Sequence, residues 1–267
     1  MTPTPTSTGK LRAGLLVLAT FAIVAVVGPA VTGAPALDLA HDLDADHGVL
    51  GAGEGGVDVV AGVVYGARAS AIVAGLSTLL SLLIAVVIGL GAGVAGGRVE
   101  AAVQRVVDVV LAFPSLLLAL ILCALLPPSP WSTVAALSLT AWAGPLRVII
   151  GLAKEVAAKD HVKAARALGA GFARVVVVHV APLLSVPIAI QATQVFAGAV
   201  VAEASLAFLG LGPTPLSPPF FTSWGQQLDD GLAYLWAAPH IWWPPGVCIV
   251  AVAVAAQFVA EGLAARR

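Results

Sequence analysis

Charged residues are scarce in this sequence. They make up 10% of its 267 residues, whereas apolar residues make up 60%; a soluble globular domain usually has about 25% charged residues. So little charge cannot cover a water-facing surface, which excludes an ordinary soluble domain and leaves lipid as the solvent for most of the chain. The formal net charge of −1 gives no reason to expect a nucleic-acid partner.

Reactive groups and nucleotide-binding motifs are also missing. Cys123 and Cys248 lie inside apolar runs, where they are expected to be small buried residues and neither a disulfide framework nor a metal site. No GxxxxGK[ST] loop occurs, so any ATP chemistry must belong to a partner. Ser185, Ser205 and His179 are present without a nucleophile elbow or a metal-ligand pair. We therefore expect no catalytic, cofactor-binding or metal-binding residues.

Long apolar runs dominate what is present. A membrane helix needs about 20 apolar residues, and the sequence predicts an all-α membrane protein with about six such helices. Prolines 127, 128 and 130 divide one charge-free run into two helices. The predicted spans are 13–32, 69–97, 103–126, 131–152, 183–208 and 242–260, after an N-terminal segment 1–12 and with long connections at 33–68, 153–181 and 209–241. The first run exceeds the usual 7–15 residues of a secretory core, which favours a retained anchor over a cleaved signal peptide.

Basic residues predict the orientation, because they gather on the cytoplasmic side of membrane proteins. With the N-terminus inside, all but Arg68 of the Lys and Arg residues fall on the cytoplasmic side. Both chain ends are then cytoplasmic, and the acidic stretch from Asp38 to Asp58 is outside. That stretch is interpreted as a docking surface for an external partner or as a plain solvated linker.

The polar segment from Glu155 to Arg174 is the most informative part of the chain. Its Ala, Leu, Lys and Arg residues favour a helix, and Gly169 and Gly171 supply a stop. A small-residue face lies beside a basic one, and the two sets of residues are Ala158, Val162, Ala165 and Gly169, and Lys159, Lys163 and Arg166. Alanine and glycine favour protein docking over the bulky face that a lipid-bound helix presents.

The same segment resembles the cytoplasmic "EAA" loop of bacterial ATP-binding-cassette importer permeases. The resemblance rests on Lys163-Ala164-Ala165-Arg166-Ala167-Leu168-Gly169-Ala170, followed by Pro182. Further blocks resemble the dipeptide and oligopeptide branch, and within it the shorter, "C"-type subunit: Tyr65-Gly66-Ala67-Arg68, residues 107–115, residues 203–212, and Ser223-Trp224-Gly225. Lys163 stands where the family usually has Glu, and His161 where it has an aromatic residue.

The resemblance implies a type I importer permease in the bacterial inner membrane, with the permease domain at about 65–267. It implies a second homologous permease, two ATPases that bind ATP and Mg²⁺, an external solute-binding protein and a peptide substrate. It also implies coupling helices that dock on the ATPase. The residues expected to couple are Asp160, Lys163, Ala164, Ala165, Arg166, Leu168, Gly169 and Ala170. A nickel chelate or haem is an alternative cargo.

Polar groups inside the spans are candidates for the transport path or its gates, because such groups are costly in lipid. Asp108 is interpreted as an anchor paired with Arg105 or Arg147, or as part of an inner gate. Gln191 and Gln194 are candidates for the path lining, or bond to a neighbouring helix. For Glu203, the alternatives are a cap of the outer chamber, a site for a peptide amino group, or a hydrogen bond to the loop that follows it.

Two other hypotheses concern the mechanism and the glycines. An ion-driven secondary transporter would need carboxylates near the midplane and repeated halves, and the nearly charge-free spans argue against it. Gly89, Gly91 and Gly93 are better explained by close helix packing than by helix sliding.

Overall fold

The computed structural model describes residues 5–32, 38–46, 48–212 and 222–265. Arg266 and Arg267, Pro35 and all of the proline-rich stretch 213–219 lie outside the described residues. Apart from an isolated bridge between Ala52 and Asp58, the regular structure of the described residues is helical. The elements are α1 (Pro5–Thr32), η1 (Leu39–His41), η2 (Glu54–Gly56), α2 (Val59–Ala95), α3 (Gly97–Leu111), α4 (Ser115–Leu125), α5 (Pro130–Ala141), α6 (Ala143–Ala157), α7 (Asp160–Ala167), α8 (Phe172–Arg174), η3 (Val175–Val180), η4 (Ala181–Leu184), α9 (Ser185–Leu206), η5 (Ala207–Leu211), α10 (Trp224–Leu232) and α11 (Trp243–Ala264).

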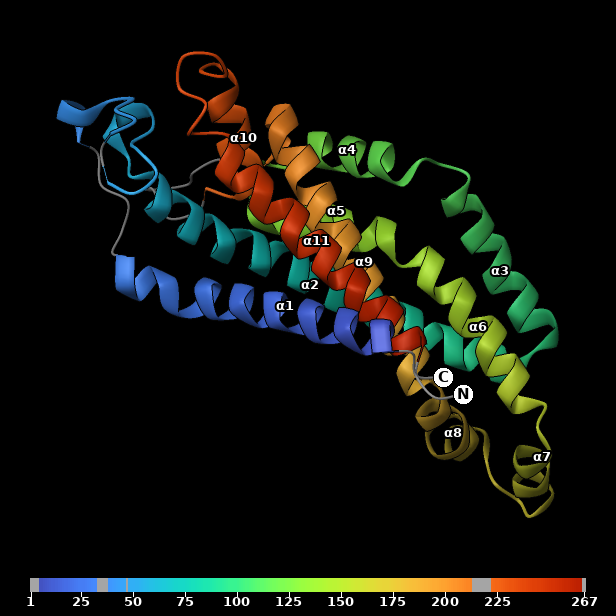
Figure 1. Cartoon of the computed structure of the whole chain (residues 1–267). Helices are drawn as coiled ribbons and strands as arrows, with labels where there is room; N and C mark the ends of the chain where they lie inside the picture. The colour runs from blue at the N-terminus through green and yellow to red at the C-terminus, as the bar shows by residue number, and fades with distance from the viewer. Residues whose placement is uncertain (1–4, 33–37, 47, 213–221, 266–267) are drawn as a thin grey trace.

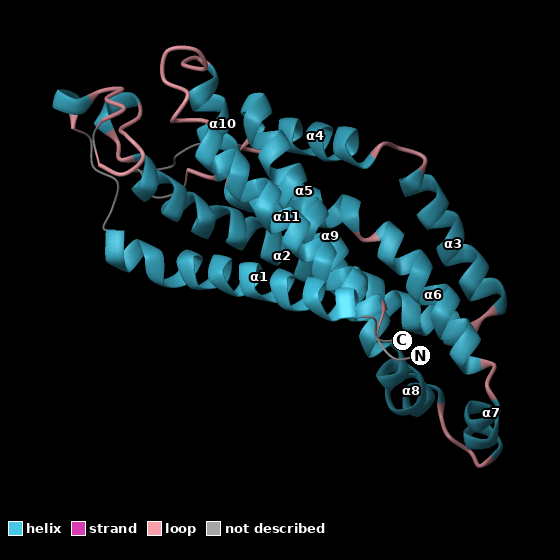
Figure 2. Cartoon of the chain, in the orientation of Figure 1, coloured by secondary structure: helices cyan, strands magenta, loops and turns pink. Residues whose placement is uncertain are grey.

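Among the described residues, five helical stretches are long and apolar enough to cross a membrane, or up to six if one bent pair counts as a span. The five are 8–32, 59–95, 130–157, 172–211 and 243–264, and the bent pair is α3 with α4. Short connections join several of the helices, such as α2 to α3 and α5 to α6, whereas a longer stretch that includes η1 and η2 precedes α2 (Figure 2). This is the all-α architecture expected of a type I permease.

The third predicted span needs correction. The sequence suggests one helix over 103–126, but α3 and α4 meet at a 78° bend. The break falls at Ala112-Phe113-Pro114, where the proline has no N–H to donate and its ring excludes a helical residue before it.

Other helix bounds also differ from the predicted ones. α2 begins at Val59, ten residues before the predicted start, because the carboxylate of Asp58 accepts a hydrogen bond from the Ala61 N–H (2.8 Å) and caps the helix. Arg68 therefore lies within α2 and not in a loop. The fifth predicted span, 183–208, lies within a helical stretch that begins at residue 172, because α8, η3 and η4 lead from the polar segment directly into α9. α10 occupies part of the predicted 209–241 connection.

The helices of the fold lie around α2, which packs against α1, α5, α6 and α9. Glycine permits close approach at these contacts: a Cβ at Gly89 would lie 2.9 Å from Ile149 Cγ2 on α6. A Cβ at Gly91 would meet nothing within 4 Å. Close packing thus explains Gly89 but not Gly91. Small residues are common where membrane helices contact each other closely.

The two ends of the molecule differ in character. The start of α1 and the end of α11 lie near α8, and α7 projects from the same end (Figure 1). An ion pair between Lys10 Nζ and Glu261 Oε2 (2.7 Å) joins α1 to α11 there. The acidic 38–58 stretch and α10 lie at the opposite end (Figure 1). The segments that the basic residues assign to the two sides of the membrane thus lie at different ends of the molecule.

Candidate coupling hairpin and transport path

Residues 153–181, here called the hairpin, form two helical arms joined by a glycine turn. α7 has an acid, Asp160, in its first turn and a base, Arg166, in its last turn, which is the charge order that a helix dipole favours. Gly169 has φ +88°, a left-handed conformation that favours glycine, and its N–H bonds to the Arg166 carbonyl (3.0 Å). The chain then returns through α8 and η3.

The tip of the hairpin is exposed and apolar. Leu168 is 90% exposed and Phe172 is 55% exposed, and a Cβ at Gly169 would meet nothing within 4 Å. A large exposed apolar tip beside charged residues is a typical feature of a protein-binding surface. The tip lies at the end of the hairpin where a partner can reach it (Figure 1).

The small-residue face of α7 does not lie wholly outward. Val162, which the sequence places on that face, is fully buried in a core shared with Val94, Val156 and Val175. Ala165 and Ala170 are half-buried, and Ala164 is exposed. Among the described residues, Lys163 pairs with Asp160 on its own helix (3.4 Å), and the side chains of both are exposed. The structure therefore turns part of the expected docking face toward the chain's own core.

Arg166 contacts another helix of this chain. Its Nη2 donates to the carbonyl oxygen of Val94 in the last turn of α2 (3.2 Å). The sequence indicates a basic stripe for this part of α7 but no contact with a residue 72 positions earlier. The sequence does mark the end of α2, because Gly96 and Gly97 stop the helix and its last carbonyl groups then need partners from elsewhere.

Two ion pairs join α3 to α6. Asp108 bonds to Arg147, and Glu100 Oε1 bonds to Lys154 Nζ (2.9 Å). Of the two partners expected for Asp108, the structure places it with Arg147. Three of these groups, Glu100, Asp108 and Lys154, border a polar recess of ≈ 440 Å³ together with Gln104 and Arg105. The recess lies at the hairpin end of α6, so both the anchor and the inner-gate interpretations of Asp108 are compatible with its position.

Gln191 and Gln194 lie together on α9 and line a groove. The Gln191 Nε2 donates to Gln194 Oε1 (3.3 Å). The groove has a volume of ≈ 460 Å³ and is lined by residues of α4, α5, α6 and α9, including Thr140. No charged side chain is among these lining residues. The two amides thus give an otherwise mostly apolar wall its capacity to donate and accept hydrogen bonds.

Glu203 is not part of that groove. It is 1% exposed, and its Oε2 accepts from Ser70 Oγ on α2 (3.1 Å). Ser70 Oγ in turn accepts from the Trp224 N–H at the start of α10 (3.3 Å). These two bonds link α9 to α2 and α10. The partner of Glu203 is thus Ser70 on α2 and not a residue of the 205–212 loop, which the sequence suggested. This buried network holds the end of the molecule opposite the hairpin.

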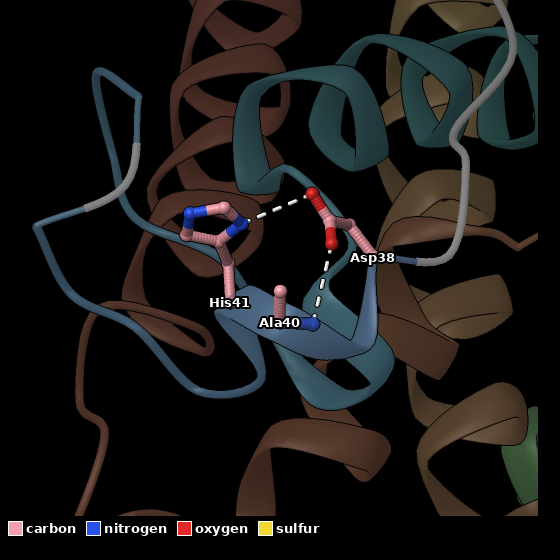
Figure 3. Close-up of polar contacts among 3 residues, drawn as sticks. All are labelled: Asp38, Ala40 and His41. Atoms are coloured by element: carbon pink, nitrogen blue, oxygen red, sulfur yellow. Dashed lines mark hydrogen bonds and ion pairs between the residues drawn. The ribbon is translucent and has the colours of Figure 1, made fainter.

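The acidic 38–58 stretch uses several of its carboxylates internally. Asp38 caps η1: Oδ1 accepts from the Ala40 N–H (3.2 Å) and Oδ2 pairs with His41 Nδ1 (3.0 Å) (Figure 3). His240 Nε2 lies 3.0 Å from the Ala52 carbonyl oxygen and ties the stretch to the segment after α10. The sequence alone predicted none of these roles, although an Asp before a short turn is a common cap.

The sequence matches a known family and curated relatives. Residues 85–266 match the family model described as "Binding-protein-dependent transport system inner membrane component". A relative named "Dipeptide transport system permease protein DppC", from Escherichia coli (strain K12), is 41% identical over 218 residues, which are 80% of this chain and 70% of the relative. "Di/tripeptide transport system permease protein DppC" of Pseudomonas aeruginosa is 34% identical over the same shares. A "Putative peptide transport system permease protein" of Brucella suis is 31% identical over 261 residues, 95% of this chain and 86% of the relative.

Proposed function

The chain belongs to the family of binding-protein-dependent transport system inner membrane components, and we propose that it is the permease subunit of an ATP-driven peptide importer. The names of its relatives support a peptide cargo. The absence of a phosphate-binding loop from the sequence supports a division of labour in which partner subunits bind ATP and Mg²⁺ and this chain catalyses nothing. Two ATPases, a second homologous permease and an external solute-binding protein complete the proposed complex in the bacterial cytoplasmic membrane.

The exposed tip of the hairpin is the observation that supports this function best. Leu168 and Phe172 are large apolar side chains that the fold leaves uncovered at a polar end of the protein. An ATPase that binds the tip can act on the permease only by favouring one conformation of it. We propose that the hairpin, with both chain ends, is cytoplasmic and that closure of the ATPases moves α6 and α9, which lead into and out of it. The groove beside Gln191 and Gln194 is then this subunit's part of the path.

The docking proposal is tested in the complete transporter by placing a charge at the tip. Leu168→Asp alters a side chain that is 90% exposed, so the fold should tolerate it while the apolar contact with the ATPase is lost. Leu232→Asp on α10 is the matched control, because Leu232 is also exposed (49%) and lies at the opposite end. We expect Leu168→Asp to lose the ATPase subunits on affinity purification and Leu232→Asp to retain them. Retention of the ATPases by both variants would refute docking at this tip.

The cargo and the coupling are tested by ATP-dependent uptake in proteoliposomes that contain all subunits, with a labelled dipeptide and its binding protein. Gly169→Trp should abolish uptake, because the indole would occupy the space where the partner lies. Gly169→Asn is the control, since Asn tolerates the left-handed conformation and is small. Normal uptake by Gly169→Trp would contradict the coupling role. Uptake of a nickel chelate or haem in place of the peptide would contradict the cargo.

A further inference from the structure

The end of α2 nearest the hairpin is held by α6. A Cβ at Gly93 would lie 2.7 Å from Ala153 Cβ and 2.7 Å from the Ile150 carbonyl oxygen. Both atoms belong to α6, so the two helix backbones are in direct contact at the last turn of α2. α6 continues from this contact into the hairpin. Any displacement of that part of α6 therefore meets α2 immediately.

α7 also contacts the last turn of α2, at the C-terminal end of that helix. The carbonyl groups of the last helical turn have no partner within their helix, and the guanidinium of Arg166 supplies one to Val94 (3.2 Å). A cation at this position also interacts favourably with the negative end of the helix dipole. Beyond Val94, Gly96 and Gly97 adopt φ +64° and +55° and turn the chain away into α3. The turn leaves the Val94 carbonyl accessible to α7.

An apolar contact supports the polar one. Val162, one turn before Arg166 on α7, is 0% exposed, and Val94 is 5% exposed in the same core. Lys163, the neighbour of Val162, is exposed and bonds to Asp160 within its own helix. Lys163 and Arg166 are both exposed residues of one short helix, but they differ in their contacts: Lys163 pairs with Asp160 on α7, and Arg166 bonds to α2.

We infer that Arg166 is a positioning residue that ties the end of α2 to the hairpin, so that α2 moves with α6 and α7 when the ATPases close. The inference rests on the proposed function and adds to it. α2 becomes a third driven helix, beside the two that lead into and out of the hairpin. Because α2 contacts α1, α5, α6 and α9, its displacement would reach most of the transmembrane region. Without the tie, the hairpin can still bind an ATPase but transmits its movement less completely.

The test uses the complete transporter with Arg166→Met, which keeps an apolar stem of similar length and removes the hydrogen-bond donors. We expect the ATPase subunits to remain bound while peptide transported per ATP hydrolysed falls about tenfold, as 1.4 kcal/mol of coupling free energy corresponds to a factor of ten. Arg166→Lys, which keeps a cationic donor, should restore most of the coupling. Arg98→Met is the control, because Arg98 is an exposed cation beyond the same end of α2 and should not affect coupling.

A distance measurement separates this role from general destabilisation. With Cys123 and Cys248 replaced by Ala, spin labels are placed at residue 91 on α2, where a side chain meets nothing within 4 Å, and at Leu16 on α1, which is 68% exposed. The distance between them should change when ATP binds, and this change should be lost in Arg166→Met and recovered in Arg166→Lys.

Three results would overturn the inference: no distance change in the otherwise unmodified chain, the same change and the same coupling in Arg166→Met, or loss of the ATPase subunits from Arg166→Met. The last would make Arg166 a docking residue. Failure of the unmodified chain to bind any ATPase would instead refute the proposed function, so the two failures are distinguishable.

Discussion

Two glycines one half-turn apart on α2 should respond in opposite ways to the same added methyl group. A methyl at Gly93 lies 2.7 Å from Ala153 Cβ and from the Ile150 carbonyl oxygen. These atoms belong to α6, and the carbonyl is backbone, so the helices must separate by several tenths of an ångström to reach a contact of about 3.5 Å. Overpacking of this kind costs about 1–3 kcal/mol. At Gly91 the same methyl meets nothing within 4 Å.

The helix propensity of alanine is about 1 kcal/mol better than that of glycine. We therefore expect Gly91→Ala to raise the free energy of unfolding by up to about 1 kcal/mol. Gly93→Ala should lower it by about 1 kcal/mol, because the overlap exceeds the gain in propensity. The assay is equilibrium unfolding in mixed micelles of a mild detergent and dodecyl sulfate, followed by circular dichroism. Gly75, which is also open, serves as a second control. A shift of the same sign and size at residues 91 and 93 would show that the contact between α2 and α6 is not as close as described.

Three further perturbations test other contacts. Ser70→Ala removes the hydroxyl that joins α2, α9 and α10. It should lower the free energy of unfolding by about 1–3 kcal/mol in the same assay, because the buried carboxyl group of Glu203 loses a hydrogen-bond donor. A change below about 0.5 kcal/mol would contradict the network. Lys10→Glu should lower the free energy of unfolding by about 0.2–1 kcal/mol at low salt, since its partner Glu261 is half exposed. The reversed pair, with Glu261→Lys added, should restore stability. An effect that persists in 1 M salt would exclude an ionic origin. Asp108→Arg should increase protease cleavage between α3 and α4 by detaching α3 from α6, and the added Arg147→Asp should reverse this; failure of the second change to rescue would mean that the pair does not anchor α3.

Local features of the sequence determined which segments are apolar helices and where several of them end. Prolines 127, 128 and 130 mark the turn between α4 and α5, and Gly169 marks the turn of the hairpin. The family could be recognised from short blocks of residues, since those blocks lie in a fixed order along the chain. Composition, periodicity and turn chemistry are properties of neighbouring residues, so they can be read without knowing which helices meet.

The bend between α3 and α4 could not be predicted from neighbouring residues alone. Phe113-Pro114 was visible in an uninterrupted apolar run, and one proline in a membrane helix is compatible with either a kink or a break. The outcome depends on what the two halves contact. α3 is held to α6 by ion pairs, whereas α4 packs on α5, and these separate partners hold the halves 78° apart.

By itself, the sequence determined the apolar helices, the polar hairpin and the family. Only the tertiary structure decided that Arg166 bonds to α2, that Glu203 bonds to Ser70, and that Gly93 but not Gly91 is a contact. The partners in the two bonds are 72 and 133 positions apart. Residues so distant in sequence leave no local pattern, because their meeting depends on how every helix between them packs.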